Sequence, residues 1–258
     1  MSYSKADFVD RLNDVSAGFS VRGHQLVRYF PFLFIGLLIS LKSVSRHQYW
    51  QIMAVEDGPA EYLTSVAYIV ASVVCIAIFT RLKKKTWSAP SAIAISLMAA
   101  LFFVVAMEEI SWGQRIFSVQ SPEFFQTYNG QAEITLHNFL SRYPLHMLFI
   151  LAGLYGGFAW KVFPTWFKVR FPKLSQFLIP NRLLRWYFLP TALLYIYYDY
   201  VSVFLINVLG LEILQWQGRS YSWIIGKDQE PIELLMSIGV MFFAIALFNR
   251  QTHGKLME

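Results

Sequence analysis

Residues 92–115 have the sequence AIAISLMAALFFVVAMEEISWGQR, and this stretch decides the fold class. No charged side chain occurs before Glu108 and Glu109, which follow the apolar run directly. A helix needs about 20 mostly apolar residues to cross the hydrocarbon core of a bilayer. The stretch therefore predicts a membrane-spanning helix that ends in a polar segment.

The whole chain has the composition of a multi-pass membrane protein. Its 258 residues are 56% hydrophobic and only 15% charged, whereas soluble domains average about 25% charged residues. Aromatic residues make up 17% and there is one cysteine, which excludes disordered chains and disulfide scaffolds. We expect an all-α membrane bundle of about six helices in a single domain, residues 1–258. The predicted spans are Tyr29–Val44, Pro59–Phe79, Ala92–Ile110, Pro144–Phe163, Trp186–Leu209 and Ile232–Phe248.

The basic residues predict the orientation of these spans. With both termini in the cytoplasm, 16 of the 22 Lys and Arg lie inside and 6 lie outside, as the positive-inside rule requires. The net charge of +6 then reflects topology and attraction to the inner leaflet. We expect a protein of the cell inner (plasma) membrane that contacts membrane lipids and binds no nucleic acid. The sequence is also compatible with a protein partner or a homo-oligomer.

Two segments outside the spans are predicted to lie on the membrane surface. Residues 1–28 form a cytoplasmic amphipathic segment, with Phe8, Leu12, Val15 and Phe19 at helical spacing. The segment Pro164–Pro180 mixes aromatic and basic residues in the same way. Both patterns are typical of interfacial helices.

The acidic residues gather on the predicted outer side. Only four of the 16 Asp and Glu fall inside, namely Asp7, Asp10, Asp14 and Glu258. Ionisable groups at membrane depth are costly and indicate a functional site by default. We therefore expect one outward-facing pocket lined by Glu, Asp and His.

The strongest single signal is the run from Glu108 to Arg115. If the helix continues through it, Glu108, Ser111, Trp112 and Arg115 share one face, and Arg115 can offset the charge of Glu108. The alternative is a polar helix end that reaches the headgroups.

The predicted outer loop, residues 111–143, carries a second signal. Glu133 and His137 are four residues apart, so a helix would bring them together. A carboxylate beside a neutral imidazole suits metal ligation or proton transfer. An exposed histidine is an equally good interpretation of His137, and for His146 a buried, hydrogen-bonded histidine is favoured.

Three further acids lie within or beside spans. Asp199 falls near the middle of the fifth span and must be protonated, paired or hydrated there. Glu61 and Glu233 occupy matching places in the pattern acid-x-x-Pro-x-Glu-x-Leu, which opens the second and sixth spans. A good helix start explains this pattern, but it also puts both glutamates level with Glu108.

The Glu-Glu-Ile-Ser-Trp-Gly-Gln-Arg run, with the later Leu136-His137-Asn138, resembles a pattern of an uncharacterised family of bacterial multi-pass inner-membrane proteins. The resemblance covers about a fifth of the chain and implies no activity. The likeness to intramembrane zinc hydrolases of the alkaline ceramidase type is limited to an acid and histidine site in a helical bundle.

Three functions fit these signals. The favoured one is a hydrolase or transferase that acts on a lipid or lipid-linked substrate at the outer leaflet. A proton- or cation-coupled transporter or channel is the first alternative, and a non-catalytic subunit that docks a partner is the second.

The enzyme hypothesis assigns roles to particular residues. The predicted catalytic residues are Glu108, Glu109, His137 and Asp199. The predicted substrate contacts are Arg115, Trp112, Gln114 and Asn138. One divalent metal ion would be held by Glu61, Glu108, His137 and Asp199, with Glu233 as a weaker candidate.

Overall fold

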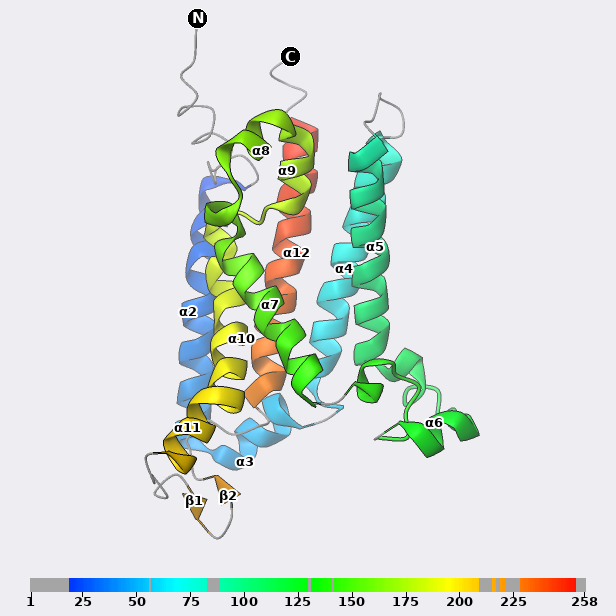
Figure 1. Ribbon diagram of the computed structural model, residues 1–258, viewed down its shortest axis with the longest axis vertical. Helices are drawn as coiled ribbons and strands as arrows, with labels where there is room; N and C mark the ends of the chain where they lie inside the picture. The colour runs from blue at the N-terminus through cyan, green and yellow to red at the C-terminus, as the bar shows by residue number, and fades with distance from the viewer. Residues whose placement is uncertain are drawn as a thin grey trace, which may run out of the picture.

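The fold is a bundle of long helices (Figure 1). The computed structural model describes residues 19–55, 57–82, 89–129, 131–140, 142–208, 215–216, 219–220 and 228–253. Within these residues, six helical segments are long and apolar enough to cross a membrane. They are built on α2 (Val21–Val44), α4 (Pro59–Leu82), α5 (Ala89–Glu109), α7 (Arg142–Val162), α10 (Arg185–Ile196) and α12 (Gln229–His253).

Short elements connect the long helices. The helical ones are α3 (Arg46–Tyr49), a π-helix Trp50–Ala54, a 3-10 turn Ser111–Gly113, α6 (Glu123–Tyr128), a 3-10 turn His137–Phe139, α8 (Thr165–Arg170), α9 (Pro172–Leu178), a 3-10 turn Arg182–Leu184, a π-helix Tyr197–Val201 and α11 (Ser202–Asn207). Strands β1 (Gln215–Trp216) and β2 (Arg219–Ser220) pair antiparallel over two residues.

The prediction of an all-α chain with six candidate spans is confirmed, but several ends differ. The first helix begins at Val21 and not at Tyr29, because the Ser20 side chain caps it by accepting a hydrogen bond from Gly23 N at 3.2 Å. The sixth helix is longer than predicted at both ends. The fifth predicted span falls on a helical segment, Leu174–Leu205, that contains the π-helix Tyr197–Val201.

The predicted interfacial segments have different outcomes. Most of segment 1–28 lies outside the described residues, which begin at residue 19. The segment Pro164–Pro180 is helical and contains α8 and α9. Its position on a membrane surface stays a prediction.

The long helices alternate in direction, so their termini collect at two ends of the bundle (Figure 1). We call one the acidic end: α4, α7 and α12 begin there and α5 ends there. The opposite end, which carries α8 and α9, is called the basic end. Glu61, Glu109 and Glu233 all fall within about two helical turns of the acidic end.

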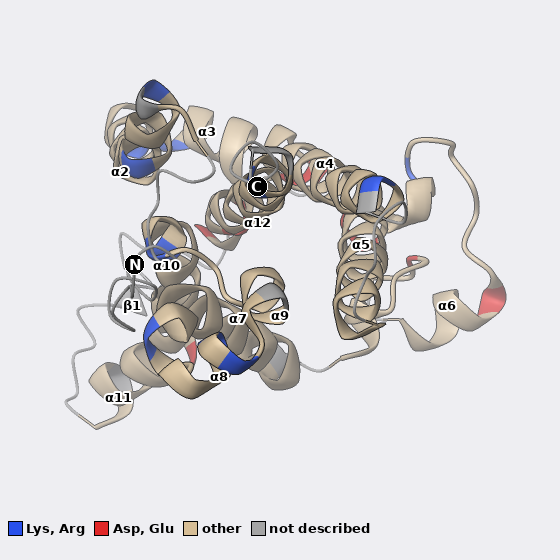
Figure 2. Ribbon diagram, turned by 90° about the horizontal axis from the view of Figure 1, so that it is seen from above, with Lys and Arg blue, Asp and Glu red and all other residues tan. Residues whose placement is uncertain are grey.

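The helices pack as two groups that meet through α10 and α12. In one group α12 packs along α4, and α4 along α5; in the other, α7 packs along α10. Figure 2 shows these two groups from above. The main apolar core draws buried side chains from α2, α4, α5, α10 and α12, among them Val27, Ile78, Ile95, Tyr187 and Leu235.

Glycines bring α7 and α10 unusually close together. A Cβ atom added to Gly153 would lie 2.7 Å from Ala192 N, and one added to Gly156 would lie 2.1 Å from Phe188 Cγ. Such distances are far below van der Waals contact, so only glycine permits this approach. The close packing matters because α7 and α10 carry the polar pair described next.

Candidate functional site

A buried carboxylate–imidazole pair links α7 to the π-helix that follows α10. His146 Nδ1 lies 2.8 Å from Asp199 Oδ2 and 2.9 Å from Oδ1. The two side chains are only 11% and 3% exposed. The tautomer is assigned from this bond: Nδ1 donates its proton to the carboxylate, and Nε2 is left as the basic nitrogen.

Helix geometry explains why these two residues meet. His146, Ile150 and Gly153 follow one another at spacings of four and three residues, so they share the face of α7 that packs on α10. At Gly153 the two helices α7 and α10 approach closely. Toward His146, α10 ends and is followed by the π-helix that carries Asp199. Single π-helical turns are rare and are frequent at functional sites.

This contact corrects the predicted depth of Asp199. The sequence placed Asp199 near the middle of a span, but His146 lies in the second turn of α7, at the acidic end. Asp199 is also paired rather than alone. The prediction that His146 is a buried, hydrogen-bonded histidine is confirmed, with Asp199 as its partner.

Tyr195 extends the pair toward α12. Its ring centroid is 4.6 Å from that of His146, and it stacks on Phe149 at 4.9 Å. The Tyr195 hydroxyl donates a hydrogen bond to Glu233 Oε1. Side chains from α7, α10 and α12 are therefore connected from Asp199 to Glu233.

Glu233 belongs to a group of carboxylates on three packed helices. It interacts electrostatically with Glu109, Glu230 and Glu61, which come from α5, α12 and α4. Glu61 Oε2 also accepts a hydrogen bond from Asp57 N at 2.5 Å. The three helices therefore bring four carboxyl groups to one region of the acidic end.

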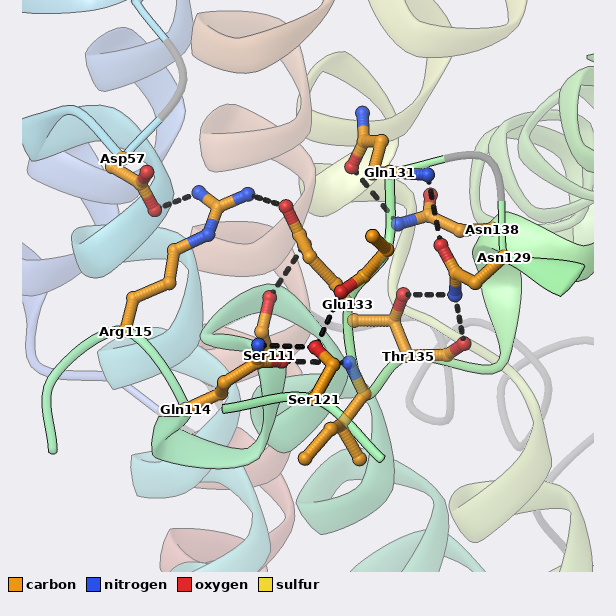
Figure 3. Close-up of polar contacts among 12 residues, drawn as sticks. Asp57, Ser111, Gln114, Arg115, Ser121, Asn129, Gln131, Glu133, Thr135 and Asn138 are labelled. Atoms are coloured by element: carbon orange, nitrogen blue, oxygen red, sulfur yellow. Dashed lines mark hydrogen bonds and ion pairs between the residues drawn. The ribbon is translucent and has the colours of Figure 1, made fainter. Parts of the chain in front are cut away.

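The loop after α5 holds a second polar cluster (Figure 3). Arg115 lies between two carboxylates and forms ion pairs with Asp57 and Glu133. Glu133 also accepts a hydrogen bond from the Ser111 hydroxyl at 2.7 Å. The positive charge of Arg115 is thus matched from both sides.

Glu108 anchors this loop to the end of α5. One carboxylate oxygen accepts from Trp112 Nε1 at 2.7 Å, and the other accepts from the backbone N–H groups of Leu136 at 2.6 Å and His137 at 2.9 Å. His137 Nδ1 lies 3.2 Å from the same oxygen. A carboxylate with several N–H donors fixes the backbone on which those donors lie.

Further polar side chains of the loop also bond within it (Figure 3). Gln114 donates to Ser121 Oγ at 2.5 Å and accepts from Ile134 N at 2.7 Å. Asn138 Nδ2 donates to Gln131 Oε1 at 2.9 Å. These bonds hold a backbone that is strained at four non-glycine residues with positive φ, namely Ser111, Trp112, Ser118 and Ala132.

Two expectations about this loop are wrong. The helix ends at Glu109, so Ser111 and Arg115 do not continue its face, and Arg115 pairs with Glu133 and Asp57. Residues 133–137 are not an α-helix, and Glu133 and His137 bind different partners. Strained turns at Ser111 and Trp112 break the period that the sequence argument assumed.

A third cluster ties α2 and α3 to the start of α12. Lys42 Nζ lies 2.6 and 2.7 Å from the two carboxylate oxygens of Asp228, and the Tyr49 hydroxyl donates to the same carboxylate at 2.5 Å. Lys42 is 5% exposed and also lies over the Tyr49 ring. This buried ion pair stabilises the acidic end.

The predicted metal ligands are divided among these clusters. Glu108 pairs with His137, Asp199 pairs with His146, and Glu61 and Glu233 belong to the carboxylate group. Among the residues that the structure describes, no three His, Cys, Asp or Glu side chains are arranged to hold a metal ion. The divalent ion stays a prediction.

The sequence argument missed His146 and Tyr195 as partners of predicted residues. A usable signal existed for His146, because residues 146, 150, 153 and 157 mark one helix face with two glycines. No spacing within one helix identifies Asp199 as the residue opposite, since the π-helix changes the period there.

Comparisons with known proteins add no family. No protein-family model matches the chain, and no curated protein or solved structure matches it significantly. The resemblance noted for the Glu108–Arg115 run therefore stays a prediction.

Proposed function

We propose that the chain is a multi-pass protein of the inner (plasma) membrane, with both termini in the cytoplasm and the acidic end facing outward. The six long apolar helical segments support insertion. The sequence assigns 16 of the 22 Lys and Arg to the predicted cytoplasmic side, and this excess supports the orientation.

Cysteine labelling tests the orientation. The native Cys75 is buried and would be replaced by alanine. Single cysteines at Gln131, in the outer loop, and at Trp166, on α8, are both exposed sites. In intact cells a membrane-impermeant maleimide should label position 131 and spare position 166. The reverse result would invert the orientation.

Within this topology, we propose an enzyme that uses acid–base chemistry on a lipid or lipid-linked ester at the outer leaflet. The observation that carries the proposal is the enclosed Asp199–His146 pair beside Tyr195. A carboxylate that orients an imidazole through Nδ1 leaves Nε2 to act as a general base. Such a pair inside a helical bundle is costly without a function.

The reaction balances with His146 as the carrier of one proton. His146 Nε2 takes the proton of an attacking hydroxyl, from water for hydrolysis or from an acceptor for transfer. The oxygen attacks the ester and the bond to the leaving group breaks. The imidazolium returns its proton to the leaving oxygen, and Asp199 stabilises the imidazolium meanwhile.

The outer loop supplies the proposed substrate contacts. Trp112 is 41% exposed and is positioned by its bond to Glu108. Arg115 would hold an anionic headgroup only by exchanging one of its two carboxylate partners. Gln114 and Asn138 support the loop through the bonds given above. Glu108 and His137 form a second carboxylate–imidazole pair, and we propose proton transfer there as well.

A lipid-turnover experiment tests the enzyme. Purified protein in liposomes would be incubated with bacterial phospholipids and lipid-linked sugars, and products followed by mass spectrometry. Turnover should be lost in His146→Ala and in Asp199→Asn. His47→Ala is the matched control, because His47 is an exposed histidine on α3, also at the acidic end.

The control separates a chemical role from a general effect on folding. Equal turnover in wild type, His146→Ala and His47→Ala would refute the assignment of His146 as the base. Loss in all three variants would indicate damage to the bundle instead, and circular dichroism would show it.

A proton-coupled transporter is the second candidate, and the carboxylate group favours it. Glu233 accepts a hydrogen bond from Tyr195, whose ring contacts His146, and Glu61, Glu109 and Glu230 interact electrostatically with Glu233. Ionisable groups gathered in this way within a bundle are typical of proton pathways. Proton flux into liposomes that depends on Glu233, measured with a pH-sensitive dye and the Glu233→Gln variant, would favour transport over catalysis.

A further inference from the structure

The outer loop exposes several large apolar side chains. Many of its polar side chains bond within the loop, among them Ser111 with Glu133 and Gln114 with Ser121 (Figure 3). In the same loop Phe117 is 76% exposed and Tyr128 is 68% exposed. Adjoining exposed apolar side chains of this size mark an interaction surface.

Three exposed aromatic side chains and the half-buried Phe125 form one organised patch on α6 and the 3-10 turn His137–Phe139. Phe124 contacts Phe125, Tyr128 and Phe139 with ring centroids 5.2–5.7 Å apart, and Phe125 contacts Phe139 at 5.6 Å. We call these four residues the aromatic patch. The packed rings favour one fixed surface, because each is held by its neighbours.

The patch continues the apolar flanks of the neighbouring spans. Leu97, Leu101 and Val104 are exposed at helical spacing on α5, and Tyr143 and Met147 are exposed at the start of α7. Figure 1 shows α6 beside the end of α5 and extending sideways from the bundle, not beyond it along the helix axes. A surface at this level meets the interfacial region of a bilayer.

From these observations we propose that the aromatic patch of the outer loop rests in the headgroup region of the outer leaflet. The inference depends on the proposed membrane insertion. Tyr is enriched at this depth because an apolar ring carries a polar hydroxyl, and Phe is typical of the apolar face of interfacial segments. Arg115 and Glu133 form an ion pair within the loop, and α6 carries one exposed charge, Glu123, beside its aromatic rings. Rings outnumber charges on this surface, which favours a lipid surface over a charged partner.

Site-directed fluorescence tests the patch. In a Cys75→Ala background, an environment-sensitive fluorophore is attached to single cysteines at Phe124 in the patch, at Gln131 on the polar side of the loop, and at Leu101 on α5. The protein is reconstituted in phosphatidylcholine and phosphatidylglycerol vesicles with nitroxide lipids labelled either near the headgroup or deep in the acyl chain. The probe at 124 should lose fluorescence to the shallow nitroxide and the probe at 131 should not.

The probe at Leu101 separates this inference from the proposed function. Quenching at 101 by the deep nitroxide, without quenching at 124, would refute the patch and leave membrane insertion standing. No quenching at either position would refute insertion as well. Equal quenching at 124 and 131 would also overturn the inference, because the loop would then have no preferred face.

A second copy of the chain could cover the aromatic patch instead of lipid. Fluorescence from the same samples distinguishes the two. If another copy covers the patch, the probe at 124 is shielded from nitroxide lipids, and its emission shifts to the red as the protein is diluted in lipid. That result would overturn the inference. A second labelled site at Phe117 guards against loss of folding in the Phe124→Cys variant.

Discussion

At the acidic end, charged side chains are held by opposite charges or by hydrogen-bond donors, whereas at the basic end several arginines lie over aromatic rings. Asp228 receives Lys42 and Tyr49, and Asp199 receives His146. At the other end, Arg81 lies 4.3 Å from the Phe248 ring centroid, and Arg182 lies 5.0 Å from that of Trp160.

This difference between the two ends indicates which charged side chains are held in fixed positions. A cation over a ring keeps much of its freedom and can still meet a headgroup. A buried carboxylate that shares donors with a histidine or a lysine has one arrangement, and moving it is costly. The acidic end is therefore the part of the bundle built to hold ionisable groups in fixed relative positions, as a reaction or a proton pathway requires.

The largest expected effect concerns the Asp199–His146 pair. Asp199→Asn keeps the shape of the side chain but removes the charge that orients His146 and stabilises its protonated form. We expect lipid turnover to fall by about 10³–10⁴-fold. Turnover per mole of folded protein is the measurement, and His137→Ala, in the loop pair, should cost less. A greater loss in His137→Ala would move the chemistry to the Glu108 pair.

The next effect concerns the ion pair that closes the acidic end. Asp228→Asn leaves Lys42 buried without its countercharge, and we expect the free energy of unfolding to fall by about 3–5 kcal/mol. Chemical unfolding in detergent would measure it. The double variant Lys42→Met, Asp228→Leu should recover most of the loss, because an apolar pair leaves no uncompensated charge. A double variant no better than Asp228→Asn would show that the cost has another origin.

The helix contact between the two ends gives a smaller effect. Gly156→Leu places atoms where Phe188 lies, so α7 must move away from α10 at a cost of about 1–3 kcal/mol. The same shift should weaken the His146–Asp199 bond and lower turnover. Gly36→Leu is the control, since a Cβ at Gly36 meets nothing within 4 Å. Equal stability of the two variants would contradict the close packing.

The loop anchor should respond locally. Glu108→Gln replaces an oxygen that accepts backbone N–H groups with a site that can also present a donor. We expect faster hydrogen exchange at the amides of Leu136 and His137, equivalent to about 1–3 kcal/mol of lost protection. Amides in the middle of α5 should not change. Unchanged exchange at residues 136 and 137 would mean that Glu108 does not hold the loop.

Sequence reasoning identified the bundle because long apolar runs such as residues 92–107 have few alternatives in a helical chain. It also predicted that Asp199, Glu108 and Glu233 occupy costly positions. It did not find the partners of Asp199 and Glu233, because these lie on other helices: His146 is 53 residues from Asp199, and Tyr195 is 38 residues from Glu233. Positive φ at Ser111 and Trp112 broke the helical period, which no local pattern indicated.

The smallest expected effect is at the basic end and concerns Lys168. This lysine is 6% exposed and its Nζ donates to the Trp160 carbonyl at 2.6 Å. Burial lowers the pKa of its ammonium group below the usual lysine value, so the folded state binds the proton more weakly than the unfolded chain does. The free energy of unfolding should therefore rise with pH, from the lowered pKa up to about 10.4.

Comparison of two lysines isolates this effect. Lys168→Met should remove the rise, which we expect to be about 1 kcal/mol or less. Lys161→Met should keep it, because Lys161 is exposed at the end of α7. Unfolding in detergent between pH 7 and about 10.4 measures both. If the two variants gave parallel curves, Lys168 would be as hydrated as a surface lysine, and its bond to the Trp160 carbonyl would not restrict it.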